Sequence, residues 1–146
     1  MATTEAFAGY GTVLKRGDAG SPEIFTAVAE VVSLSGLDMD LQMIEATHMT
    51  SPNAWREYIP NLKDAGELTV EMNFVPSSSE QDPSTGFLAD HENRTLRNWQ
   101  ILFSDDAGTV VQFAAYVTGF GVSTAVDAKT DASLRLRITG ALTWNP

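Results

Sequence analysis

The sequence predicts a mainly β protein, and three observations lead to this prediction. Apolar and polar residues alternate with a period of two along most of the chain. The apolar positions are rich in Val, Ile, Leu and Phe, most of which favour strands. The length of 146 residues suits one domain whose core needs no disulfide, and the chain has no cysteine. We therefore expect a single β domain over residues 1–146.

Four strands are expected in the first half of the chain. They cover residues 10–15, 23–34, 38–43 and 67–74. Segment 23–34 is apolar on both faces, which indicates a strand covered on two sides. Segments 38–43 and 67–74 each have one apolar face and one polar, acid-bearing face. The polar positions are Asp38, Asp40 and Gln42 in the first and Glu67, Thr69 and Glu71 in the second.

Three more strands are expected in the second half. Residues 99–103 and 109–120 form a predicted hairpin around the turn at 104–108. The sequence Gly-Phe-Gly at 119–121 indicates a bulge or bend in the second of these strands. Segment 133–139 alternates cleanly, so its leucines and isoleucine should point inward and Arg135 and Arg137 outward.

One helix is expected, at residues 82–93. Asp82 is a suitable N-cap, and Pro83 follows at the first helical position. Phe87 and Leu88 should face the sheet.

The stretch 47–66 has no usable alternation and is predicted to be a long loop. It concentrates Trp, Tyr and Arg, which are enriched at the hot spots of protein interfaces. We expect it to contact another subunit, because exposed aromatic side chains on a loop would otherwise promote aggregation. The alternative is a loop that folds back over the end of its own domain. The expected contact residues are Trp55, Arg56, Glu57, Tyr58, Ile59, Lys63 and Asp64.

Composition and motifs argue against several functions. A net charge of -10 and a pI near 4.4 are unsuited to a module that grips DNA through Lys and Arg. The apolar runs are too short for a membrane span, and no signal peptide is visible. The acidic pairs lack the spacing of a calcium loop, and no hydrolase elbow is present. We expect no catalysis, no metal, no cofactor and no membrane association.

Five blocks, in order along the chain, resemble the tail tube (major tail) proteins of long-tailed, non-contractile bacteriophages. They are FTAVAEV at 25–31, WREYIPNLKDAGE at 55–67, LRNW at 96–99, YVTGF at 116–120 and SLRLRITG at 133–140. The block at 55–67 is the most specific of them. Phage-derived particles such as gene transfer agents carry the same type of subunit.

The resemblance implies a β-sandwich with one flanking helix. Such subunits form hexameric rings with a continuous inner β-barrel, and the rings stack into a hollow tail tube through which DNA passes to the host cell. Long loops and terminal segments, here including the N-terminal arm at 1–9, bridge to the next ring. The implied partners are further copies, the tape measure protein and DNA in the lumen, and terminator and baseplate or initiator proteins at the tube ends. The implied location is the virion tail, assembled in the host bacterial cytoplasm.

The charge suggests how such a channel would work. A lumen that passes DNA must not bind it, and each inward Lys or Arg would add a phosphate contact. We therefore expect an acidic lumen wall, with Arg135 and Arg137 placed away from the channel. The expected lumen positions are Asp38, Asp40, Gln42, Glu67, Thr69 and Glu71.

Two alternatives stay open from the sequence. One is a monomeric β-sandwich that binds carbohydrate through Trp55, Tyr58 and Trp99. The other is the related ring-forming tube protein of type VI secretion, which would pass effector proteins rather than DNA.

Overall fold

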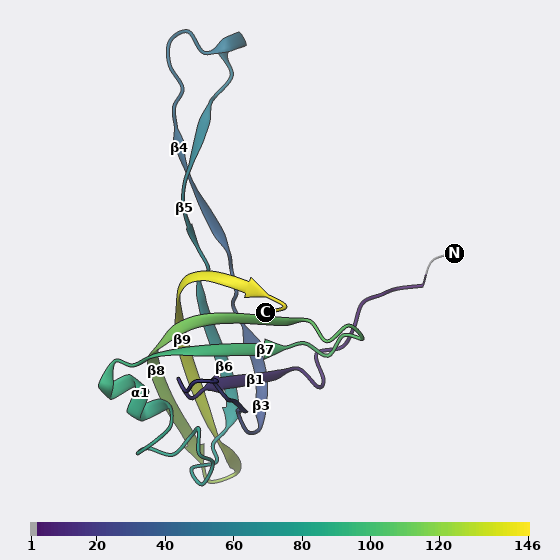
Figure 1. Cartoon of the computed structure of the whole chain (residues 1–146), viewed down its shortest axis with the longest axis vertical. Coiled ribbons are helices and arrows are strands. Elements are labelled where there is room, and N and C mark those ends of the chain that lie inside the picture. The colour runs from purple at the N-terminus through teal and green to yellow at the C-terminus, as the bar shows by residue number, and fades with distance from the viewer. Residues whose placement is uncertain (1–2) are drawn as a thin grey trace.

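The computed structural model describes residues 3–146, which form nine strands and one α-helix (Figure 1). The strands are β1 (Val13–Gly17), β2 (Phe25–Ala27), β3 (Val31–Ser35), β4 (Asp40–Glu45), β5 (Tyr58–Asp64), β6 (Glu67–Asn73), β7 (Leu96–Leu102), β8 (Val110–Ala125) and β9 (Ala128–Trp144). The helix is α1 (Phe87–Asn93), and a 3-10 helix, η1, covers Pro52–Ala54. The prediction of a mainly β fold with one helix is confirmed.

Seven of the strands form one antiparallel sheet, in the order β2-β1-β7-β8-β9-β6-β3. β8 and β9 are long and bend, so that both contribute to two layers (Figure 1). One layer contains β2, β1 and β7 with the first half of β8, and the other contains β3 and β6 with the second half of β8. The strands of the two layers cross at a steep angle, which is the orthogonal form of a β-sandwich.

The bend in β8 lies where the glycines predict it. Pairing with β9 shifts between Val117 and Gly119, which leaves Thr118 as the bulged residue. A Cβ atom at Gly119 would lie 2.3 Å from Nη2 of Arg135, so a larger residue would displace that guanidinium from its position over the strand. The predicted bulge is confirmed, and it turns β8 from one layer into the other.

The hydrophobic core lies between the two layers and under α1. Phe87 at the start of the helix packs on Trp99 of β7, with ring centroids 5.8 Å apart. The other fully buried side chains come from both layers: Leu14, Leu68, Val70, Met72, Ile101, Val111, Leu134 and Leu136. The inward positions expected for β6 and β9 are therefore confirmed.

The helix is shorter than predicted. It begins at Phe87, and its N-cap is Gly86 rather than Asp82. The Asp82 carboxylate instead accepts the backbone N–H of Ser84 at 2.8 Å, which closes a turn before the helix and lowers the pKa of Asp82. The chain turns tightly here, since a Cβ atom at Gly86 would lie 2.0 Å from the carbonyl oxygen of Glu80.

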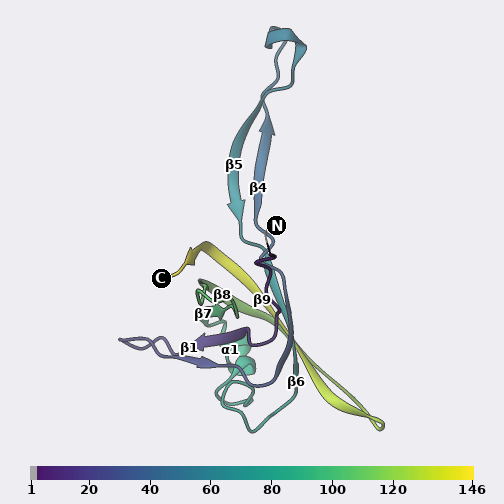
Figure 2. The same ribbon diagram turned by 90° about the vertical axis from the view of Figure 1, so that its right-hand side faces the viewer.

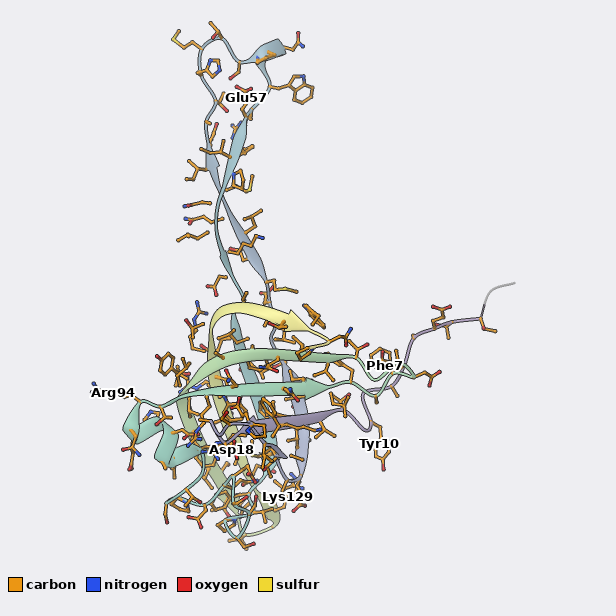
Figure 3. The ribbon with its side chains drawn as sticks, viewed as in Figure 1. Phe7, Tyr10, Asp18, Glu57, Arg94 and Lys129 are labelled. Atoms are coloured by element: carbon orange, nitrogen blue, oxygen red, sulfur yellow. The ribbon has the colours of Figure 1, made fainter. Side chains whose placement is uncertain are left out.

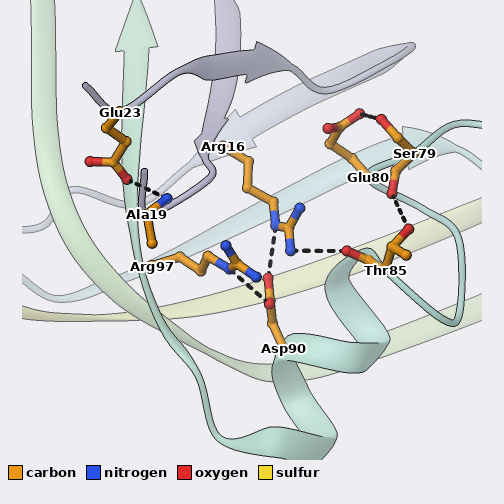
Figure 4. A network of polar contacts seen from close by, with 8 residues as sticks. All are labelled: Arg16, Ala19, Glu23, Ser79, Glu80, Thr85, Asp90 and Arg97. Atoms are coloured by element: carbon orange, nitrogen blue, oxygen red, sulfur yellow. Dashed lines mark hydrogen bonds and ion pairs between the residues drawn. The ribbon is translucent and has the colours of Figure 1, made fainter. Parts of the chain in front are cut away.

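A buried ion cluster fastens α1 to the sheet (Figure 4). The Asp90 carboxylate accepts hydrogen bonds from Nε of Arg16 at 2.8 Å and Nε of Arg97 at 2.9 Å. Arg16 also donates to the carbonyl oxygen of Thr85 at 3.1 Å. These residues come from β1, β7 and the helical segment, so the cluster joins three elements that are distant in sequence.

The predicted strand at 23–34 is wrong as one element. It is divided into β2 and β3, which lie at opposite edges of the seven-stranded sheet. Between them the chain passes from one edge to the other with Val28 buried, and it turns at Glu30, whose φ is 53°. Val28 is the one buried residue of segment 23–34, so its apolar character belongs to two partly exposed edge strands and not to a strand covered on both sides.

The predicted loop at 47–66 is also wrong in its second half. Residues 58–64 form β5, which pairs with β4 as a separate two-stranded sheet. This hairpin projects far from the body (Figures 1 and 2). The true loop is the tip between Glu45 and Tyr58, and segment 38–43 belongs to the hairpin rather than to the main sheet.

Candidate assembly surfaces

The β4–β5 hairpin is exposed along its whole length. Every residue of both strands is exposed, so the apolar face expected for 38–43 is not covered by the chain itself. The exposed apolar side chains are Met39, Leu41, Met43, Ile44, Met49, Trp55, Tyr58, Ile59 and Leu62. A lone two-stranded hairpin is marginally stable in water, and an apolar surface of this extent marks a contact site.

The tip of the hairpin is held by a polar network around Glu57 (Figure 3). The Glu57 carboxylate accepts the hydroxyl of Ser51 at 2.7 Å and lies 3.2 Å from Nε2 of His48. Glu57 is therefore used within the tip. Its neighbours Trp55, 74% exposed, and Arg56 stay free at the surface.

The base of the hairpin is a close crossing of two backbones. A Cβ atom at Gly36 would lie 2.2 Å from the carbonyl oxygen of Glu67, and one at Gly66 would lie 2.8 Å from that of Asp38. Both glycines have positive φ, 129° and 88°. These close backbone contacts fix the direction in which β4 and β5 leave the body.

Asp64, expected at an interface, closes this crossing. Its carboxylate accepts the backbone N–H of Gly66 at 2.9 Å and a hydrogen bond from Nη2 of Arg137 at 2.5 Å. The Gly66 N–H, followed by the Arg137 guanidinium, lowers the pKa of Asp64.

The polar face of the second layer carries both signs of charge. In the register of β6 with β9, Glu67 lies opposite Arg137 and Thr69 opposite Arg135. Directly opposed residues share one face of a sheet. The prediction that the arginines lie on a different surface from Glu67, Thr69 and Glu71 is therefore wrong, because all the outward positions of β6 and β9 point the same way.

This polar face continues onto the hairpin. Asp64, which reaches Arg137, lies opposite Asp40 in the β4–β5 register. Two residues further along β4, Gln42 accepts a hydrogen bond from Asn61 at 3.0 Å. Asp40, Gln42 and Asp64 therefore follow Glu67, Thr69 and Glu71 on one side of the molecule. Asp38 is exposed at the crossing.

The second layer ends in two free strand edges. β7 pairs with β8 only as far as Tyr116, so the stretch of β8 at 117–125 has β9 on one side and, among residues 3–146, no strand on the other. β3 is the opposite edge. Each edge carries an exposed valine: Val32 is 61% exposed and Val122 50%. Unpaired edges with apolar side chains are sites of strand pairing between chains.

The N-terminal arm contacts the seven-stranded sheet where β7 ends and the turn to β8 begins. Within the predicted arm, residues 1–2 lie outside the described residues, and residues 3–8 form no helix or strand. Phe7 packs edge-on against Phe103, with centroids 6.4 Å apart, and the Ser104 hydroxyl donates to the carbonyl oxygen of Ala8 at 2.6 Å.

Other kinds of site find little support. Trp99 is fully buried and cannot stack on a sugar, which removes part of the platform considered for carbohydrate binding. Among residues 3–146 no three His, Asp or Glu side chains are grouped to hold a metal ion. No helix in this part of the chain is both long and apolar enough to cross a membrane.

Comparison with known proteins gives a consistent result. A family model described as "Lambda phage tail tube protein, TTP" matches residues 7–145. No curated protein sequence matches the chain significantly. The fold is similar to a subunit in the tail of an empty gene transfer agent particle with C6 symmetry: TM-score 0.76, 15% identity, covering 97% of this chain and 100% of that one.

Two further solved structures have the same fold. One is the tail tube of phage SPP1, with a TM-score of 0.70 and 14% identity over 96% of this chain and 79% of that one. The other is a chain in the sheath/tube terminator structure of the extracellular contractile injection system PVC, with a TM-score of 0.72 and 16% identity over 99% and 100%.

Proposed function

Because the chain belongs to the lambda phage tail tube protein family and is a structural subunit of a tail tube, we propose that six copies close a ring and that the rings stack into a channel for DNA. The number six follows the C6 symmetry of the gene transfer agent tail with the same fold. The single observation that carries the proposal is the four-stranded layer β8-β9-β6-β3 with its two free edges.

Ring closure joins these edges. β3 of one subunit pairs with the 117–125 stretch of β8 in the next subunit, which covers Val32 and Val122 and satisfies the backbone groups of both edges. The edges lie on opposite sides of the layer, so one contact repeated around an axis closes a ring.

The resulting barrel has a suitable width. Six copies of the layer supply about two dozen strands, spaced about 4.8 Å apart and tilted by about 40° to the axis of a closed barrel. The circumference is then about 150 Å, and the backbone diameter is about 48 Å. Inward side chains take about 5 Å on each side, which leaves roughly 38 Å. This opening admits one DNA duplex.

The lumen wall is the polar face of the layer, because the other face is the core. It carries five carboxylates and three cations: Asp40, Asp64, Glu67, Glu71 and Asp131 against Lys129, Arg135 and Arg137. Two of the cations are already engaged, Arg137 with Asp64 and Lys129 with Asp131. The wall therefore stays net acidic and offers few free cations to phosphates, as a channel for DNA requires.

Stacking uses the hairpin. Its exposed apolar strands and the Trp55–Arg56 tip extend beyond the body along the direction of the β6 and β9 strands (Figures 1 and 2). We place Trp55, Arg56, Tyr58, Ile59 and Lys63 in the contact with the adjacent ring, where the apolar side chains lose their contact with water.

The assembled tube sits in the tail of a virion or of a related particle. We propose the tape measure protein and then DNA as occupants of its lumen, and a terminator and a baseplate or initiator complex at its ends; the likeness to a chain in a sheath/tube terminator structure supports an end partner. This role is structural, with no catalytic step and no cofactor.

Electron microscopy of the purified protein tests the proposal. Wild type should form rings or tubes with a central channel. Val32→Lys places a charge at the ring seam and should abolish rings while the monomer stays folded, because Val32 is mostly exposed. Ala107→Lys, in the exposed turn between β7 and β8, is the matched control and should assemble normally. A Val32→Lys variant that forms normal rings would refute closure through β3.

A further inference from the structure

A groove of about 510 Å³ lies at the base of the hairpin, beside the C-terminal part of β9. Its apolar lining includes Met39, Leu41, Ala141 and Trp144. All four side chains are exposed, although the groove is next to the core. It belongs to the end of the body from which the hairpin projects (Figures 1 and 2).

The turn between β8 and β9 lies at the opposite end of the molecule (Figures 1 and 2). Ala125 pairs with Ala128, so Val126 and Asp127 form a two-residue tip. The Val126 side chain is fully exposed. Turn tips favour Gly, Asn, Asp, Ser and Pro, so neither turn geometry nor the core explains an apolar, β-branched residue here.

We propose that the β8–β9 turn of a subunit in one ring inserts into this groove of a subunit in the adjacent ring. The inference rests on the proposed tube function and specifies a second stacking contact, at the base of the hairpin rather than at its tip. Val126 is the apolar anchor. The β8–β9 turn at one end of the subunit and the groove at the other form a head-to-tail contact, which repeats along a tube without closing on itself.

The β8–β9 turn and the groove carry opposite charges that can pair. Lys63 lines the groove and can meet Asp127 of the inserted tip. Asp40 and Asp64 also line the groove, and the charge of Asp64 is already paired with Arg137. Complementary charges set the register of a docked element and discourage other orientations. The occupant is therefore a second copy of this chain.

Cysteine pairing in assembled tubes tests the contact directly, because the chain has no cysteine of its own. Val126 lies in the β8–β9 turn and Ala141 in the groove at the base of the hairpin. These two regions are at opposite ends of one subunit (Figures 1 and 2), so a disulfide between Val126→Cys and Ala141→Cys forms only between subunits. Oxidised tubes of this double variant should run as a ladder of linked chains on a non-reducing gel. The control pair Val126→Cys with Ala107→Cys should stay monomeric on the gel. Normal tubes of the first variant without crosslinks would overturn the proposal.

A charge exchange gives an independent result if the cysteine variant assembles poorly. Lys63→Glu and Asp127→Lys alone should each reduce the yield of tubes about tenfold and leave single rings, because each places like charges in contact. The double variant should recover tubes. No recovery overturns the contact, whereas a wild type that forms neither rings nor tubes contradicts the tube function itself.

Discussion

Replacing Asp90 by Asn is expected to destabilise the isolated subunit strongly. The Asp90 side chain is 2% exposed, and its two oxygens accept hydrogen bonds from Arg16 and Arg97. Asn has one acceptor oxygen and no charge, so the substitution leaves the nearly buried Arg16 guanidinium without a counter-charge. Removing one partner of a buried ion pair costs about 3–5 kcal/mol.

This loss is large against a total stability of about 5–15 kcal/mol for a typical domain. A chain of this size loses roughly 2–4 °C of Tm per kcal/mol, so Tm should fall by about 6–20 °C. Thermal unfolding of the monomer, followed by circular dichroism at neutral pH, measures the change. Glu92→Gln, on the exposed side of the same helix, is the control and should change Tm by less than about 2 °C. An equally small change for Asp90→Asn would refute the role of the cluster.

Three further predictions concern the base, the tip and the lumen. In an NMR titration the Asp64 carboxyl should titrate below its ordinary pKa of 3.8, so its contacts are complete above that pH and are lost as the pH falls through the lower folded-state pKa. In Arg137→Gln the midpoint of this titration should rise, and an unchanged midpoint would disprove the pairing. In a Trp144→Phe variant, where Trp99 is buried and Trp55 is the exposed tryptophan, quenching of the fluorescence by acrylamide should decrease when rings stack. Undiminished quenching in tubes of this variant would exclude the tip from the contact. In intact tubes, Glu71→Cys should react with a small maleimide but not with a maleimide attached to a bulky polymer. The control Glu92→Cys, on α1, should react with both reagents. Reaction of the polymer reagent at position 71 would show that Glu71 does not face the lumen.

The sequence predicts best those strands that have one face in water and one in the core of the same chain. β6 and β9 alternate for this reason, and their inward residues are buried as expected. The bulge at Gly119 was also predictable, because glycine leaves room for a neighbouring side chain.

The hairpin was harder to predict because neither of its faces is buried within the subunit. β5 contains Pro60 and exposed residues throughout, so no contrast between core and solvent marks it as a strand. Composition still located the exposed tip, since Trp55 and Arg56 are typical of interfaces. Local rules fail where the surroundings of a segment come from other chains.

The separation of acids from arginines failed for a different reason. The alternation of apolar and polar residues predicts that Glu67 and Arg137 each point outward, but it does not predict that their strands, β6 and β9, lie next to each other. Adjacency is a property of topology, and a long-range pairing such as β6 with β9 leaves no local signal in either strand. The mixed polar face follows only once the register is known.

The continuity of β8 and β9 through both layers has a mechanical consequence. Where the two sheets of a β-sandwich share no strand, they are held together by the side chains of their inner faces. Here a pull applied to the 117–125 stretch of β8 passes into the layer of β1, β2 and β7 along the peptide bonds of β8 itself and across its ladder with β9. In a tube made of such subunits the contacts between subunits are non-covalent, but the two layers inside each subunit are joined by covalent chain and deform together.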